Sequence, residues 1–102
     1  MRRIYKYPLQ MGVAKQEIEM PKNAKILSAG LDPNGELCAW CMVEDTEAAA
    51  SKTIYCIGTG WPVDLITAEA EDKLIFLNSV TQGEFVWHFF TIKENIFELI
   101  ES

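Results

Sequence analysis

The sequence predicts a mainly β fold, a compact single-domain antiparallel sandwich or small barrel of about seven strands. Seven short segments are rich in β-branched and aromatic residues, and turn signals separate most of them at intervals of roughly 8–12 residues. No internal repeat is present. Of 102 residues, 49% are apolar and 24% are charged, which indicates one globular domain over residues 1–102 rather than a disordered chain.

The first four strands are expected at residues 3–9, 13–20, 24–31 and 36–44. The first alternates tyrosines with basic residues, and the second alternates charged and apolar residues loosely, as half-exposed strands do. Pro21-Lys22-Asn23 breaks the second strand. The third and fourth should form a hairpin, because Asp32-Pro33-Asn34-Gly35 is a strong turn signal that tolerates positive φ.

The last three strands are expected at residues 53–57, 74–80 and 85–92. Residues 45–51 are polar and alanine-rich, which predicts a loop or a single helical turn, and residues 64–72 a short helix or a loop. Residues 81–84 should turn the chain into the last strand. The tail, residues 93–102, has apolar residues at helical spacing and is predicted to be a short C-terminal helix or a disordered end.

The expected seventh strand begins with six residues, Phe85 to Phe90, of which five are apolar and one is the only histidine, His88. In a strand, alternate side chains point to opposite faces, so both faces of this segment are mostly apolar. A chain of this length has little material to cover both faces of a sheet. The pattern therefore favours a homo-oligomer, or a ligand or partner that covers the second face.

Charge is unevenly distributed along the chain. Residues 1–25 contain six basic and two acidic residues, whereas the remaining 77 contain three lysines and thirteen acids, so a +4 segment precedes a −10 segment. The acidic balance disfavours direct binding to nucleic acid. A local anion-binding site near the N-terminus is still compatible with this charge distribution. Its candidate residues are basic or aromatic: Arg2, Arg3, Tyr5, Lys6 and Tyr7. The alternative is a solvated edge strand protected by its charges.

The loop Gly58-Thr59-Gly60-Trp61-Pro62 is the other candidate ligand-binding site. Its glycines allow close approach of the backbone to a ligand, and Trp61 could stack on a planar group. It is neither a P-loop nor a dinucleotide-binding fingerprint. The alternative is an ordinary exit from a strand, since glycine and proline are common in loops.

His88 is expected to be a packed residue with one satisfied nitrogen, with a ligand contact or a general acid–base role in a hydrolase as the alternatives. Spacing supplies no serine or cysteine partner for it, and no paired carboxylates suggest acid–base catalysis. The sequence therefore predicts a protein that is not an enzyme, with no catalytic residues and no cofactor.

Three cysteines, Cys38, Cys41 and Cys56, are an odd number and are expected to be buried free thiols. In a strand the two cysteines of Cys38-Ala39-Trp40-Cys41 would face opposite sides, so no metal site is expected. No apolar run reaches the roughly 20 residues of a membrane span. The N-terminus does not read as a signal peptide, so the expected location is cytoplasmic.

Several segments together resemble a family of small uncharacterised phage and prophage proteins. They are residues 1–9 (MRRIYKYPL), the run from Glu17 to Pro21 leading into residues 24–28, the loop of residues 58–62, and Phe85-Val86-Trp87-His88. Members often carry histidine where this chain has Trp61. The resemblance implies a small accessory protein in the cytosol of an infected host bacterium, of a kind that commonly acts by binding and sometimes blocks host defence.

Two hypotheses for function follow. The first is a counter-defence protein that sequesters a nucleotide-type small molecule, with Trp61 and Tyr5 or Tyr7 stacking on a base and Arg2, Arg3 or Lys6 contacting phosphates. The alternative is an acidic protein-binding inhibitor of a host defence or nucleic-acid-binding protein, whose association is accelerated by complementary charge. Neither hypothesis requires a membrane or direct contact with nucleic acid.

Overall fold

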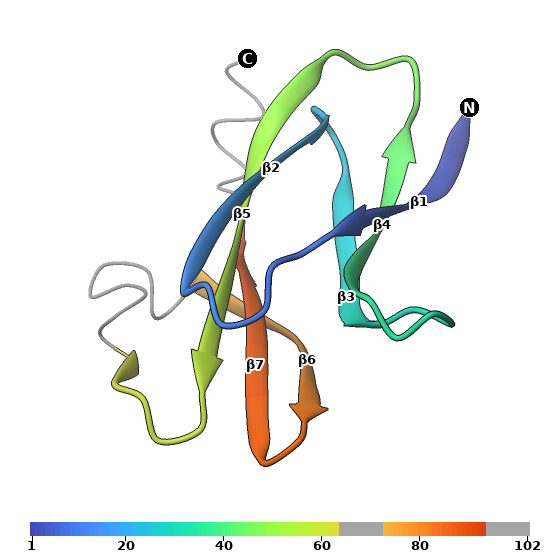
Figure 1. Cartoon of the computed structure of the whole chain (residues 1–102). Coiled ribbons are helices and arrows are strands. Elements are labelled where there is room, and N and C mark those ends of the chain that lie inside the picture. The colour runs from blue at the N-terminus through green and yellow to red at the C-terminus, as the bar shows by residue number, and fades with distance from the viewer. Residues whose placement is uncertain (64–72, 94–102) are drawn as a thin grey trace.

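The computed structural model describes residues 1–63 and 73–93, in which seven strands form two antiparallel sheets (Figure 1). The first sheet has the order β1-β4-β3 and the second the order β2-β5-β7-β6. The strands are β1 (Arg2–Pro8), β2 (Lys15–Pro21), β3 (Lys25–Leu31), β4 (Leu37–Glu44), β5 (Ala49–Gly58), β6 (Leu74–Gln82) and β7 (Phe85–Ile92). The mainly β, sandwich-like fold predicted from the sequence is therefore confirmed.

Two hairpins and three longer-range ladders build the sheets. β3 and β4 pair across the turn that begins at Asp32, and β6 and β7 pair across a two-residue turn that starts at Gly83, with a φ of 58°. β1 pairs with β4, and both β2 and β7 pair with β5, all antiparallel. The two sheets meet where β3 lies beside β6, and there the Asn78 side-chain amide donates to the Ala29 carbonyl at 2.8 Å.

The core lies between the inner faces of the two sheets. β4 contributes alternate residues to it, and β7 contributes Trp87 and Phe89, of which Phe89 is fully buried. Alternation places Cys41 in this core and Cys38 on the opposite face of β4, and both are buried free thiols, as is Cys56. Burial raises the pKa of the Cys41 thiol to about 11, so it remains neutral at physiological pH.

The second face of β5 and β7 is also apolar, as the sequence predicts. Tyr55 and Ile57 on β5 are buried there, and Phe90 of β7 packs against them. Phe76 on β6 makes an edge contact with Phe90, with ring centroids 5.6 Å apart, and is 58% exposed. This face therefore combines a buried centre with an exposed aromatic ring at its β6 side.

Several predicted strand boundaries differ from the structure: Pro21 belongs to β2, Thr81 and Gln82 belong to β6, and the largest difference is at the start of β5. β5 begins at Ala49, whereas the sequence placed the strand at residues 53–57 and a loop or helical turn at residues 45–51. The reason is tertiary pairing: β2 is matched along its whole length by β5, with Pro21 opposite Ala49. An alanine-rich stretch with low β propensity becomes a strand because a neighbouring strand supplies its hydrogen bonds.

The predictions for residues 64–72 and for a helical tail at residues 94–102 lie outside the described residues. Within the described ranges, no helix is long and apolar enough to cross a membrane.

Substitution of two phenylalanines of β7 tests how the core is packed. Phe89→Ala should lower the free energy of unfolding by about 3–5 kcal/mol, because it removes a fully buried ring from the core. Phe85→Ala is the matched control: this ring is 63% exposed and stacks on Trp87, so the loss should be about 1 kcal/mol. Urea denaturation of both variants measures the difference. Equal losses would contradict the assignment of Phe89 to the centre of the core.

Candidate functional site: a lysine-lined pocket

The N-terminal basic residues are partly engaged in ion pairs within the first sheet. Arg3 Nε donates to Asp45 Oδ2 at 2.6 Å, and Lys6 Nζ donates to Asp32 Oδ2 at 2.8 Å. The N-terminal ammonium group pairs with Glu44 and Asp45. These carboxylates compete with any phosphate for the same cations, which favours the alternative of a charged edge strand over an anion site at Arg3 and Lys6.

Asp32 organises the turn after β3 as well as binding Lys6. Its Oδ1 accepts hydrogen bonds from the backbone N–H groups of Asn34 and Glu36, at 2.8 Å and 2.9 Å. Its side chain is 2% exposed, and the bonds from Lys6 and these N–H groups hold the pKa of its carboxyl below the usual range. Lys6 therefore acts as a structural partner of the turn.

The predicted loop at Gly58 folds back on itself. The Trp61 N–H donates to the Gly58 carbonyl at 3.0 Å, and Gly60 has a φ of 90°. The Trp61 ring packs edge-on against Trp87, with centroids 5.3 Å apart, and remains 37% exposed. A Cβ on Gly58 would lie 2.9 Å from Trp61 Cε2. Glycine is therefore required at position 58 for tryptophan packing, while one part of the Trp61 ring stays accessible to a ligand.

His88 lies between two hydroxyl groups. Ser79 Oγ is 2.6 Å from Nδ1, and Thr59 Oγ1 is 2.7 Å from Nε2. Spacing along the sequence supplied no serine partner for His88, whereas the β6–β7 register puts Ser79 directly opposite it. A neutral imidazole donates through one nitrogen and accepts through the other, so both hydroxyls can be satisfied at once. The expectation of a packed histidine with one satisfied nitrogen thus understates its bonding.

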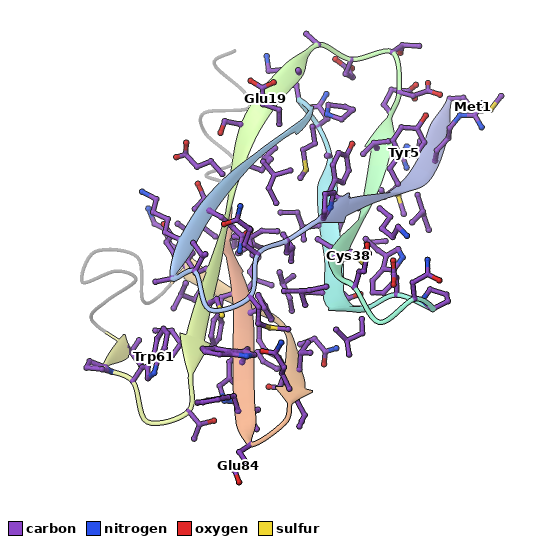
Figure 2. All side chains as sticks on the ribbon, viewed as in Figure 1. Met1, Tyr5, Glu19, Cys38, Trp61 and Glu84 are labelled. Atoms are coloured by element: carbon purple, nitrogen blue, oxygen red, sulfur yellow. The ribbon has the colours of Figure 1, made fainter. Side chains whose placement is uncertain are left out.

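The structure separates the ten sequence-predicted site residues into two groups. Arg2, Arg3, Tyr5, Lys6 and Tyr7 belong to β1 of the first sheet, whereas residues 58–61 and His88 belong to the second. In Figure 2, Tyr5 and Trp61 lie on opposite sides of the molecule. Tyr5 and Trp61 of one chain therefore do not stack on the same base.

A pocket of about 570 Å³ lies where strands of both sheets come together at their ends. Its size falls within the range of small-molecule sites, on the order of 300–1,000 Å³. Four of the seven lysines line it: Lys25 at the start of β3, Lys52 in β5, Lys73 just before β6 and Lys93 just after β7. The other lining residues are Asn23, Ala24, Ile26, Ser51, Thr53, Ile75, Thr91 and Ile92.

Hydrogen bonds between the strands fix the positions of the pocket residues. The backbone N–H of Lys93 donates to the carbonyl of Lys73 at 2.8 Å, which fixes these two residues side by side at the open end of the β6–β7 hairpin. The Thr91 hydroxyl donates to the Thr53 carbonyl at 3.0 Å and ties β7 to β5 within the pocket. The backbone therefore brings together cations from distant parts of the sequence.

Three of these ammonium groups are uncompensated in the described structure. Within residues 1–63 and 73–93, no carboxylate forms an ion pair with Lys25, Lys73 or Lys93. Clustered like charges repel, and an anion bound between them relieves that repulsion. In the same part of the chain, no three histidine, cysteine or acidic side chains come together as a metal site requires. The pocket is therefore suited to an anion.

Sequence reasoning missed this pocket because the four lysines are scattered over 69 positions. A signal was present: Lys73 and Lys93 directly flank two strands expected to form a hairpin, so pairing those strands would have placed the two lysines side by side. Lys25 and Lys52 could not be added without knowing that β3 and β5, from different sheets, approach the same end.

The chain belongs to a family of proteins described as "Domain of unknown function (DUF7352)", whose model matches residues 1–97. No curated protein and no solved structure matches the chain.

The Asp32–Lys6 pair predicts a pH-dependent stability. Because the folded-state pKa of Asp32 is below its unfolded value of about 3.9, the pair stabilises the fold above that pH, and this contribution is lost as pH falls through the folded-state pKa. Asp32→Asn should therefore be less stable than the wild type at pH 6, and the gap should narrow below about pH 4. The midpoints of urea denaturation of both proteins, measured between pH 2 and 7, give this difference in stability.

Lys6→Met is the matched control, because it removes the largest cause of the pKa shift while leaving the turn carboxylate in place. It should reproduce part of the same pH-dependent loss. A gap between wild type and Asp32→Asn that is constant from pH 2 to 7 would contradict this role for the pair.

Proposed function

We propose that this protein acts by binding, without catalysis, and that its lysine-lined pocket holds a nucleotide-type small molecule through phosphate groups. The observation that carries the proposal is the convergence of Lys25, Lys52, Lys73 and Lys93 on one pocket, in a chain with a formal net charge of −6. An acidic protein that gathers lysines in a concave site concentrates its positive potential there.

The pocket offers a phosphate group both charge and hydrogen bonds. Ammonium groups donate to phosphate oxygens through strong charge-assisted hydrogen bonds, and the hydroxyls of Ser51 and Thr53 supply further polar groups at the wall. Ile26, Ile75 and Ile92 form an apolar part of the lining that suits the uncharged portion of a ligand. The combination favours a small amphipathic anion such as a nucleotide.

The concave shape also distinguishes this ligand from a polymer. A nucleic acid binds along an extended positive surface, whereas here four lysines line one pocket and the exposed carboxylates of Glu17 and Glu19 occupy the neighbouring edge strand β2. Their charge repels a long polyanion more than a small one. The proposal is therefore for a small molecule and not for direct binding to DNA or RNA.

In the phage setting suggested by the sequence resemblance, such a protein would sequester a nucleotide signal of a host defence pathway in the host cytoplasm. Sequestration depends on affinity and copy number rather than turnover, so it requires no catalytic residues. Association into a homo-oligomer through the second face of the β5–β7 sheet stays a prediction, as does the contribution of Trp61 and His88. An acidic inhibitor of a host protein is the alternative function.

Isothermal titration calorimetry against cyclic dinucleotides, ADP-ribose derivatives and mononucleotides tests the proposal. At least one should bind, and Lys93→Gln should weaken its Kd by at least about tenfold, because a hydrogen bond between charged groups contributes about 1.5–3 kcal/mol. The wild-type affinity should fall as salt concentration rises.

Lys15→Gln is the matched control. Lys15 is an exposed lysine on β2 outside the pocket, so the same change in net charge should alter the Kd less than twofold. The absence of heat with every ligand would overturn the proposal, and so would equal effects of the two substitutions. In that case the acidic inhibitor becomes the better hypothesis, tested by salt-sensitive capture of a host protein.

A further inference from the structure

A second pocket, of about 440 Å³, shares two lining residues with the lysine-lined pocket. Asn23 and Lys25 line both, so the two cavities adjoin at the loop before β3. The remaining lining residues of the second pocket are Arg2, Met42, Val43, Glu44 and Glu47. A ligand anchored by phosphate in the first cavity can therefore extend past Lys25 into the second.

The second pocket differs from the first in its chemistry. Glu44 is already bonded to the N-terminal ammonium and to Thr46, but the exposed carboxylate of Glu47 has no partner within residues 1–63 and 73–93. Arg2 likewise forms no ion pair in this part of the chain. The pocket thus presents the unpaired carboxylate of Glu47 together with the donors Arg2 and Lys25 and the amide group of Asn23.

Guanine matches this set of groups. Its Watson–Crick edge carries adjacent N–H donors that a carboxylate can accept together, and its O6 and N7 are the atoms that Arg and Lys bind most often. Adenine offers one exocyclic amino group beside an acceptor nitrogen, so it would leave part of the carboxylate unsatisfied. Met42, half-buried in the pocket wall, supplies a polarisable side chain against a ring.

We propose that the second pocket recognises a guanine base, so that the ligand class is a guanine nucleotide with its phosphates at Lys25, Lys73 and Lys93 and its base at Glu47 and Arg2. This inference rests on the proposed function of the lysine-lined pocket and specifies its ligand. Lys25 lies at the boundary and serves both parts of the ligand.

The test compares GDP, ADP and pyrophosphate by isothermal titration calorimetry on the full chain. GDP should bind about tenfold tighter than ADP, since a bidentate base contact gives discrimination of about that size. Glu47→Gln should weaken GDP binding to the level of ADP. It removes a negative charge, so a purely electrostatic effect would strengthen the binding of both nucleotides, whereas loss of base recognition weakens GDP alone.

Glu19→Gln, an exposed carboxylate on β2 outside both pockets, is the matched control and should leave the preference for GDP unchanged. Equal affinity for GDP and ADP, with pyrophosphate binding that is lost in Lys93→Gln, would overturn guanine recognition and leave the lysine-lined pocket as an anion site. No binding of any of the three compounds would overturn both proposals for this ligand class. Thermal unfolding of each variant verifies that it is folded.

Discussion

Burial of the inner face of β7 is the constraint on which the rest of the structure depends. Phe89 has no exposed surface, and Trp87 beside it packs against two close-lying glycines, Gly12 and Gly58. Because β7 lies between β5 and β6, fixing its inner face also fixes the register of both neighbours. That register sets Ser79 against His88 and brings Lys73 beside Lys93. Core packing therefore sets the strand register, and the strand register positions the residues of the candidate site.

The sequence predicted the fold well because its signals are local. Alternation of apolar residues identified β4 and β7, and the turn at Asp32 was found from residues that prefer that conformation. It failed at residues 49–51, where no local signal exists and only the ladder to β2 makes a strand. The distinction is physical: side-chain patterns report burial and turns, whereas pairing between distant strands is decided by the whole sheet.

The candidate site was predicted less well for the same reason. Arg3 and Lys6 looked like an anion site because they are close in sequence, yet each meets an aspartate that is at least 26 positions away. The pocket lysines looked unremarkable because they are isolated in sequence and converge only in three dimensions. The positions of charged residues in the sequence thus do not show which cations are neutralised by ion pairs. They also do not show which cations remain available to bind an anion.

The ion-paired carboxylates of the described residues contact cations of the first sheet and not Lys25, Lys73 or Lys93 of the pocket. Asp32 and Asp45 are used to neutralise cations of β1, which stabilises an exposed edge strand. Glu17 and Glu19, on the strand beside β5, form no ion pair with any described residue, although a carboxylate facing the pocket would relieve repulsion among its lysines. Within residues 1–63 and 73–93 no carboxylate pairs with Lys25, Lys73 or Lys93, so their positive potential stays available to the anion that we propose as the ligand of the pocket.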